Sequence, residues 1–224
     1  MRTAVGVLAR EPSSGGKSRL AAHLSASRLT ALRHALLGDT LTALAGLPDV
    51  FLFVTPDEAL SEVETGLPVI PQGGGDLGAR MLHALQFLLK GSDPAAPSVA
   101  ILVGSDVPLL TADHLREAAE LLPTPGSAKA SAERGIVLGP AADGGYYLIG
   151  MRHAYPELFE RIAWGSESVL TDTLRAAERA GIDAHLTRSA YDVDTIDDLL
   201  RVERDLAWLP SGVCPALRRW FNEA

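Results

Sequence analysis

The segment Val99–Gly104 constrains the fold of this 224-residue chain more than any other. Its six residues are apolar or glycine, which is too short a run for a helix of ordinary length, and three of them are β-branched. Such a composition favours a strand buried on both faces, as in a parallel sheet. Gly104-Ser105-Asp106 ends the run, and Pro108 cannot continue a strand ladder. Asp106 is therefore predicted just beyond the carboxyl end of a central strand, where open α/β sheets bind ligands.

The rest of the chain alternates between the two apolar periodicities. Strands are predicted at residues 3–9, 49–55, 67–71, 135–139, 146–150 and 183–187. Helices are predicted at 27–45, 58–65, after Gly73–Asp76, after Thr111, at 168–180 and 195–209, and in the tail around Trp220 and Phe221. This alternation predicts one α/β domain over residues 1–224 with a largely parallel, doubly wound sheet and an antiparallel hairpin around Asp143-Gly144. Residues 123–134 have the composition of an exposed, mobile loop.

Bulk properties limit the partners. A formal charge of −8 without a Lys/Arg cluster argues against a nucleic-acid-binding surface. The single cysteine, Cys214, rules out an internal disulfide and a cysteine zinc cluster. The apolar run at 4–9 is too short for a signal sequence, and no segment approaches membrane-spanning length. We expect a cytoplasmic protein with small-molecule partners and no membrane partner; a homodimer is left open.

The loop Gly15-Gly16-Lys17-Ser18-Arg19 follows the first strand. Its glycines allow backbone N–H groups to approach phosphate oxygens, and Lys17 and Arg19 supply positive charge. The Gly-Lys-Ser sequence also ends a P-loop, but Glu11 occupies the position of that motif's first glycine. The alternative is a solvated loop with two surface cations; its place after the first strand favours phosphate binding.

Two further glycine-rich turns admit two interpretations each. The segment from Gly73 to Arg80, GGGDLGAR, could hold an anion or let a nucleotide base lie against the backbone, or Asp76 could simply cap the next helix. Asp143-Gly144-Gly145-Tyr146 resembles ordinary Asp-Gly turns, so from its sequence alone a structural role is favoured.

Three acids could hold a metal ion. Asp192 and Asp194 lie two residues apart, so an extended backbone projects them from the same face, and Asp106 is predicted at a strand end. Carboxylate oxygens suit Mg²⁺ or Mn²⁺, which would neutralise a diphosphate. The alternative is that Asp194 or Thr195 only caps the helix beginning at Ile196.

Read together, these segments resemble a known family. The matching pieces are KSRL at 17–20, GDLGARM at 75–81, GSDVPLLT at 104–111, GPAADGGYYLIG at 139–150 and DVDTIDDL at 192–199. Over residues 3–205 the chain resembles the bacterial nucleotide-diphospho-sugar-transferase-like proteins of the GT-A glycosyltransferase superfamily. These are related to the guanylyltransferases of molybdenum-cofactor and deazaflavin-cofactor synthesis. Val107 and Leu109 depart from the family's usual Cys and Asp, and Trp164-Gly165-Ser166-Glu167 departs from its Trp-Ser-Thr.

The resemblance implies an α/β, GT-A (Rossmann-like) three-layer sandwich with a mostly parallel mixed sheet. It also implies roles for individual residues. Phosphates would be held by Gly15, Gly16, Lys17 and Arg19; a Mg²⁺ or Mn²⁺ ion by Asp106 and Asp194 with Asp192 as helper; the nucleotide would face Gly75, Asp76, Gly78 and Arg80, and the acceptor would face Asp143, Gly144, Gly145 and Tyr146. Lys17, Arg19 and Asp106 would be catalytic, with Asp143 as a base or an acceptor anchor.

The leading hypothesis is a metal-dependent transferase with a nucleotide-sugar or nucleotide donor and an unknown small-molecule acceptor. Glycosyl transfer would release a nucleoside diphosphate, whereas nucleotidyl transfer from a triphosphate would release pyrophosphate. A P-loop NTPase and a non-catalytic nucleotide-binding module are the other hypotheses. The fold alone does not choose among them.

Overall fold

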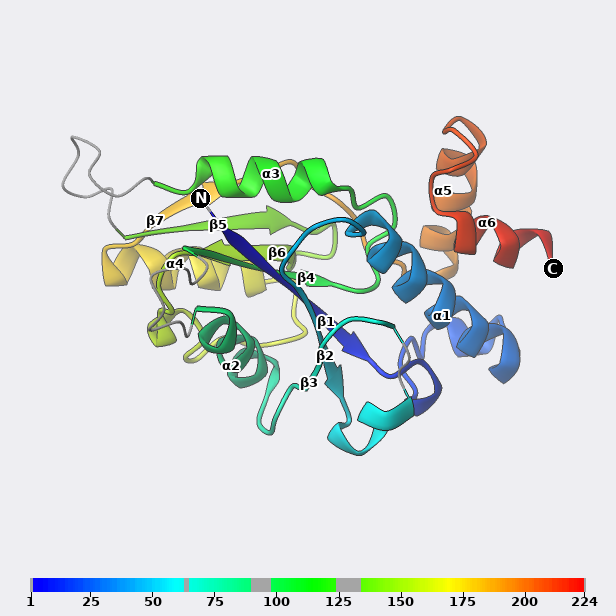
Figure 1. Ribbon diagram of the computed structural model, residues 1–224, viewed down its shortest axis with the longest axis horizontal. Helices are drawn as coiled ribbons and strands as arrows, with labels where there is room; N and C mark the ends of the chain where they lie inside the picture. The colour runs from blue at the N-terminus through cyan, green and yellow to red at the C-terminus, as the bar shows by residue number, and fades with distance from the viewer. Residues whose placement is uncertain (1, 63–64, 90–97, 124–133, 224) are drawn as a thin grey trace.

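The computed structural model describes residues 2–62, 65–89, 98–123 and 134–223, so most of the predicted loop at 123–134 lies outside the described residues. A seven-stranded sheet has the order β3-β2-β1-β4-β6-β5-β7 (Figure 1). The strands are β1 (Thr3–Arg10), β2 (Val50–Thr55), β3 (Val69–Pro71), β4 (Val99–Gly104), β5 (Gly135–Pro140), β6 (Tyr146–Met151) and β7 (Asp183–Leu186). The α-helices lie at predicted positions: α1 (Ala26–Ala43), α2 (Leu77–Leu89), α3 (Ala112–Leu121), α4 (Val169–Ala180), α5 (Ile196–Ala207) and α6 (Pro215–Asn222). The helix predicted at 58–65 is instead a 3-10 helix, Asp57–Glu62, and residues 63–64 lie outside the described residues.

The sheet is mixed and mostly parallel, which confirms the predicted α/β class. Strands β3, β2, β1 and β4 pair in parallel, and so do β5 and β7. Strand β6 is antiparallel to both of its neighbours, β4 and β5. The predicted hairpin is thus confirmed, and its second strand lies between β4 and β5.

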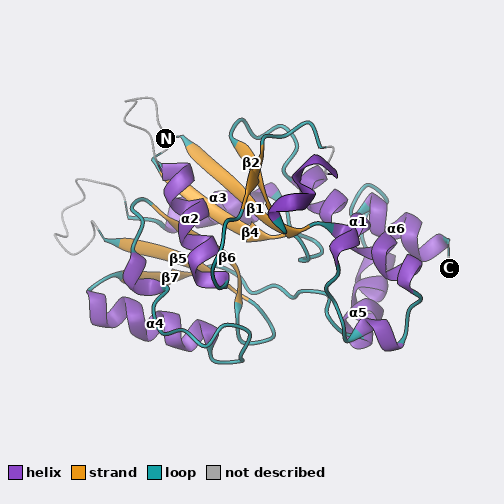
Figure 2. Ribbon diagram, turned by 90° about the horizontal axis from the view of Figure 1, so that it is seen from below, coloured by secondary structure: helices purple, strands orange, loops and turns teal. Residues whose placement is uncertain are grey.

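Strand β4 occupies the middle of the sheet and is covered on both faces, as its sequence predicts. Each residue of Val99–Val103 is 1% exposed or less. Val99, Ile101 and Val103 pack in one core with residues of α1 and α3, whereas Ala100 and Leu102 pack in a second core with residues of α2 and α4. The sheet therefore forms the middle of three layers (Figure 2).

A third group of buried side chains lies outside these layers, and we call it the helical cluster. It joins the first half of α1 to α5, α6 and the segment before α5 (Figures 1 and 2). Its buried members are Leu20, Leu29, Leu32, Ala35, Leu36, Tyr191, Val193, Leu199, Val202, Leu206, Cys214, Leu217 and Trp220. Trp220 is buried, as the predicted amphipathic tail helix requires, and its indole Nε1 donates to Arg28 O at 3.0 Å.

Asp39 of α1 caps the tail helix from a distance of 177 residues along the chain. Its Oδ1 accepts from the Ala216 N–H at 2.8 Å and its Oδ2 from the Leu217 N–H at 2.9 Å. These are orphan donors in the first turn of α6, where Cys214 provides no side-chain cap. The carboxylate is therefore the anchor of α6 on α1.

Asp39→Ala is expected to lower the free energy of unfolding by about 2 kcal/mol, because it leaves the buried Leu217 N–H and the partly buried Ala216 N–H without acceptors. The urea midpoint of the purified protein measures this loss. Asp39→Asn retains one acceptor oxygen and is expected to lose less. Equal stability of Asp39→Ala and the unaltered chain would show that α6 does not depend on this cap.

Among the described helices, none has both the length and the apolar character needed to cross a membrane.

Candidate active site

Three acids meet at the carboxyl edge of the sheet. One carboxylate oxygen each from Asp106, Asp192 and Asp194 can be chosen so that all three lie within 4.8 Å of one another. Asp106 follows β4, and the extended segment that carries the other two is tied to it by a hydrogen bond from Val193 N–H to Asp106 O of 3.1 Å. Val193 is fully buried in the helical cluster, so the acids before and after it project outwards.

The three acids form a concentration of negative charge. Burial, together with the nearby carboxylates of Asp106, Asp143 and Asp194, raises the pKa of Asp192 to about 6. Within the part of the chain that the structure describes, Asp192 forms no ion pair. An oxygen-only donor set of three carboxylates fits a hard divalent cation such as Mg²⁺ or Mn²⁺.

Lys17 supplies the positive charge that the other two acids contact. Its Nζ lies 3.2 Å from Asp106 Oδ2 and 3.0 Å from Asp194 Oδ1. Burial lowers the pKa of Lys17, but the two carboxylates more than offset this, so its pKa is raised above the ordinary value. The side chain is therefore a buried ammonium ion.

Asp194 is free to make this contact because another residue caps α5. The Thr195 hydroxyl accepts from the Asp198 N–H, and Asp198 Oδ2 accepts from the Thr195 N–H at 2.8 Å, forming a capping box. The alternative role that the sequence allowed, helix capping, thus falls on Thr195.

The Lys17 loop is not built as a P-loop. Gly15, Gly16 and Lys17 have φ angles of 112°, 105° and 54°, in the region that favours glycine. A short 3-10 turn, Leu20–Ala22, follows, and α1 begins only at Ala26. A P-loop instead leads directly into its helix. The Gly-Lys-Ser similarity therefore gives no support to the NTPase hypothesis.

A cavity of about 220 Å³ lies beside Lys17 and is rich in cations. Arg10, Lys17 and Arg33 line it together with Gly15, Gly16, Asp106 and Asp194. No sequence pattern points to Arg33, because it lies on α1, 16 residues after Lys17, and belongs to no motif. Its Nη1 donates to Pro12 O at 2.6 Å, which fixes the guanidinium against the loop. Three cations around one small cavity suit a chain of phosphates.

Asp143 lies between two further cavities. One, of about 510 Å³, is lined by Lys17, Ser18, Arg19, Asp143, Gly165, Ser166, Glu167 and Asp194. In the turn itself, Asp143 Oδ1 accepts from the Gly145 N–H at 2.9 Å, and Gly144 O accepts from the Leu170 N–H at 2.9 Å. The turn is therefore fixed against the start of α4, and Arg19 lines the same cavity as Asp143.

The other cavity beside Asp143 has a different character. It measures about 240 Å³, and apolar side chains line it along with three acids. Its lining comprises Leu77, Met81, Gly104, Asp106, Val107, Ala141, Asp143, Gly145, Tyr146, Tyr147, Trp164, Gly165, Ser166, Val169 and Asp192. Burial raises the pKa of Tyr146, so its phenol stays neutral near pH 7.

The segment from Gly75 to Arg80 contains a helix cap and a close packing contact. Asp76 Oδ1 accepts from the Ala79 N–H at 2.9 Å, as a helix cap does, and a Cβ on Gly78 would lie 2.6 Å from the Trp164 ring. Arg80 Nη1 donates to Gln72 Oε1 at 3.4 Å. The three cavities described above are lined by none of Gly75, Asp76, Gly78 and Arg80.

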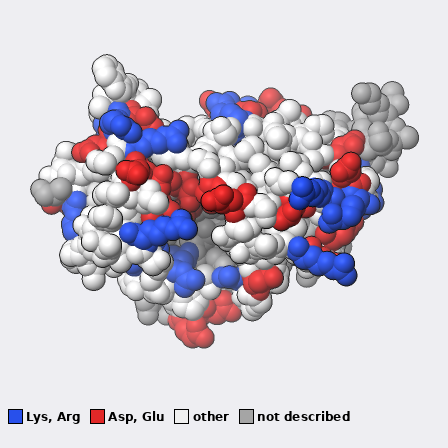
Figure 3. Space-filling view, turned by 180° about the vertical axis from the view of Figure 1, so that it is seen from behind, with Lys and Arg blue, Asp and Glu red and all other residues white. Residues whose placement is uncertain are grey.

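On the face turned away from the viewer in Figure 1, Asp and Glu side chains gather near the middle of the surface with Lys and Arg side chains beside them (Figure 3). Acidic and basic side chains thus lie close together on this face.

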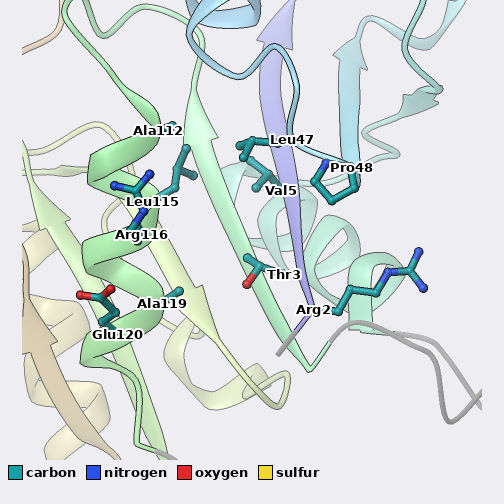
Figure 4. Close-up of a pocket in the computed structure, with 10 residues that line it drawn as sticks. All are labelled: Arg2, Thr3, Val5, Leu47, Pro48, Ala112, Leu115, Arg116, Ala119 and Glu120. Atoms are coloured by element: carbon teal, nitrogen blue, oxygen red, sulfur yellow. The ribbon is translucent and has the colours of Figure 1, made fainter.

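A further cavity, of about 630 Å³, is lined by none of Asp106, Asp192 and Asp194. Figure 4 shows its lining residues. Thr3 and Val5 of β1 line it, with α3 on one side and Leu47 and Pro48 on the other. Thr3 and Val5 belong to the amino-terminal half of β1, whereas ligands of open α/β sheets bind at the carboxyl ends of the strands. We therefore place the site at the acids.

Comparison with known proteins assigns the family. Residues 39–166 match the model of DUF2064, described as uncharacterized proteins conserved in bacteria. The chain belongs to the DUF2064 family. The matched region contains Asp106 and the Asp143 turn, whereas Lys17, Asp192 and Asp194 lie outside it.

Similar proteins include one named as a transferase. A phosphoenolpyruvate guanylyltransferase of Sphaerobacter thermophilus is 31% identical over 206 residues, covering 88% of this chain and 91% of that protein. A structure from Desulfovibrio desulfuricans G20, provisionally described as a nucleotide-diphospho-sugar transferase, superposes with a TM-score of 0.79 at 24% identity and covers 98% of this chain and 95% of its own. A CMP:2-keto-3-deoxy-manno-octonic acid synthetase complexed with CTP has a TM-score of 0.53 at 13% identity, covering 92% and 99%. The fold is thus GT-A-like, and the relatives support a transferase.

Proposed function

We propose that this protein transfers a nucleoside monophosphate from a nucleoside triphosphate to a small phosphorylated acceptor, in a reaction that depends on Mg²⁺ or Mn²⁺. The observation that carries the proposal is the cavity lined by Arg10, Lys17 and Arg33 next to the three acids. The acids are suited to a metal ion, and the cations extend the site for phosphates beyond it. A triphosphate needs both.

In the proposed reaction, an oxygen of the acceptor's phosphate attacks the α-phosphorus of the triphosphate. The bond from the α-phosphorus to the oxygen that bridges to the β-phosphorus breaks, and pyrophosphate leaves. Negative charge gathers on the leaving pyrophosphate, and Arg10, Lys17 and Arg33 are positioned to stabilise it. An acceptor phosphate is already ionised at neutral pH, so no general base is required and Asp143 is assigned to ligand contact.

A divalent cation held by Asp106, Asp192 and Asp194 would neutralise phosphate charge and act as a Lewis acid at the reacting phosphate. The protein's own residues then position the reactants. The Gly75 to Arg80 segment is proposed to face the nucleotide. Arg80 contacts Gln72, whose Nε2 donates to Ala9 O in β1 and Phe53 O in β2, and this keeps the segment beside the carboxyl halves of these strands, where open α/β sheets bind ligands. The Asp143–Tyr146 turn is proposed to face the acceptor.

The guanylyltransferase relative supports nucleotidyl over glycosyl transfer and makes GTP the first donor to test. Its printed acceptor, phosphoenolpyruvate, carries a phosphate and a carboxylate. The cavity of about 510 Å³ offers an acceptor of this class the cations of Lys17 and Arg19 and the hydroxyl groups of Ser18 and Ser166. Three acids, Asp143, Glu167 and Asp194, line the same cavity, so the acceptor's negative groups are proposed to lie on the side of the two cations.

The test is acceptor-dependent release of pyrophosphate. The purified protein is incubated with GTP, ATP, CTP or UTP, with or without phosphoenolpyruvate, in Mg²⁺ or in EDTA. Pyrophosphate is then measured by cleaving it with inorganic pyrophosphatase, with Mg²⁺ restored, and detecting the phosphate formed. We expect release only with a nucleotide, the acceptor and the metal together. UDP-glucose and GDP-mannose are tested in parallel: release of a nucleoside diphosphate from either, without pyrophosphate release from any triphosphate, would instead establish glycosyl transfer.

A further inference from the structure

Lys17 is more deeply buried than the acids it contacts. Its side chain is 9% exposed, whereas the side chains of Asp106 and Asp194 are 41% and 40% exposed. The ammonium therefore sits beneath two carboxylates that are open to solvent on their other side. A cation that arrives from solvent meets these carboxylates before it meets Lys17.

We propose that the Lys17 ammonium serves as the resident counter-ion of Asp106 and Asp194, and that a divalent cation displaces it from them on binding. This inference rests on the proposed function only in taking the three acids as the metal ligands. It adds that metal and lysine compete for the same two carboxylates, so that metal binding releases Lys17 to the phosphates.

The competition follows from the short distances. Lys17 Nζ lies 3.2 Å from Asp106 Oδ2 and 3.0 Å from Asp194 Oδ1, so it already fills a position between the two acids. A Mg²⁺ ion needs oxygen ligands at about 2.0–2.1 Å, and a metal ion bound to both carboxylates would lie within a few ångströms of the ammonium. Two positive charges at that separation in a partly buried site repel each other strongly.

Two cavities beside Lys17 could accept its ammonium group after displacement. Its side chain borders the cavity of Arg10 and Arg33 on one side and the cavity of Arg19 and Ser166 on the other. A rotation of side-chain torsions, without movement of the glycine-rich backbone, could turn Nζ from the acids towards a phosphate in either cavity. The released ammonium would then add to the cations already there. Metal and phosphate binding are therefore coupled through one side chain, each favouring the other.

The coupling can be measured without turnover, by titrating the full chain with Mn²⁺ in the absence of nucleotide. Lys17→Met removes the competing charge and is expected to bind Mn²⁺ about tenfold more tightly than the unaltered chain, within the range usual for coupled sites. Lys17→Arg keeps the charge and is expected to stay near the unaltered affinity. Arg19→Met is the matched control, because it removes a nearby cation that makes no ion pair with the three acids in the described structure.

Thermal unfolding gives a second readout and shows whether the variant folds. Without metal, Lys17→Met leaves three carboxylates facing one another and is expected to melt below the unaltered chain. Saturating Mn²⁺ is expected to raise its melting temperature more than that of the unaltered chain. A larger metal-induced rise in Lys17→Met supports exchange even if the metal-free variant is too unstable to titrate.

The outcomes separate this inference from the proposed function. Equal or weaker Mn²⁺ binding by Lys17→Met, with pyrophosphate release intact in the unaltered chain, would overturn the exchange and leave nucleotidyl transfer standing. Tighter Mn²⁺ binding by Lys17→Met but not by Arg19→Met supports the exchange even if no pyrophosphate is released. An equal gain in both variants would overturn it, because loss of any nearby positive charge would then explain the result. Failure of both the unaltered chain and Lys17→Met to bind millimolar Mn²⁺ would overturn the exchange and the metal site together.

Discussion

Asp106→Asn is expected to lower the rate of pyrophosphate release by at least about 100-fold, more than the loss usual when a residue supporting a metal ligand is removed. Asp106 connects the sheet to the segment that carries the other two acids. It follows β4, its carboxylate contacts Lys17, and its backbone oxygen accepts from the Val193 N–H. An amide keeps the shape of the side chain but removes its charge, so divalent-cation affinity falls with the rate. The measurements are pyrophosphate release and Mn²⁺ titration.

The loss should occur without unfolding, because Asp194 remains as the ion-pair partner of Lys17 and the substitution relieves the repulsion between Asp106 and Asp192. Circular dichroism checks the fold. Asp197→Asn is a matched control, since Asp197 is an exposed acid in the first turn of α5, three residues from Asp194. Unimpaired pyrophosphate release by Asp106→Asn would remove the three acids from the proposed reaction.

Gly144→Ala is expected to lower the free energy of unfolding by about 3 kcal/mol or more, at the upper end of ordinary single substitutions. A Cβ at this position would lie 2.2 Å from Glu167 O and 2.7 Å from Glu167 C, both of them backbone atoms. Gly144 also has a φ of 88°, which a side chain disfavours. The turn that carries Asp143 would therefore have to move off the segment before α4.

Gly165→Ala measures the cost of the backbone conformation alone, so the difference between the two variants gives the steric part. Gly165 has a φ of 83°, but a Cβ there would meet nothing within 4 Å, so only the backbone preference is lost, about 1–2 kcal/mol. Urea and thermal denaturation of both variants measure the difference. Equal losses in the two variants would mean that the contact with Glu167 does not hold the turn in place.

The elements of the fold could be predicted because each has a local signal. The short β-branched run of β4, the helical periodicity of α1 and the Asp-Gly turn before β6 all depend on neighbours in sequence. The position of β6 between β4 and β5 has no such signal, because strand order depends on packing across the whole sheet.

The candidate site divides in the same way. Asp106, Asp192 and Asp194 were chosen from strand-end position and spacing, and the structure brings one oxygen of each together. Arg33 was missed because a lone arginine on a helix carries no pattern. The contact of Lys17 with two acids was also missed, since it joins residues 89 and 177 positions apart. Residue type indicates what a side chain could bind, whereas its present partner is fixed by tertiary structure.

Val193 places the candidate metal site across two parts of the molecule that need not open together. Its side chain is held by the helical cluster, whereas Asp106 belongs to the end of β4 in the sheet. Proteins open in separate cooperative units, and a fluctuation that frees α5 and α6 would carry Asp192 and Asp194 away from Asp106 while β4 stays folded. A ligand that contacts all three acids would suppress this fluctuation, because it binds only the closed form. Slow hydrogen exchange at the amides in the last turns of α5, several turns away from Asp194, would then report that the site is filled.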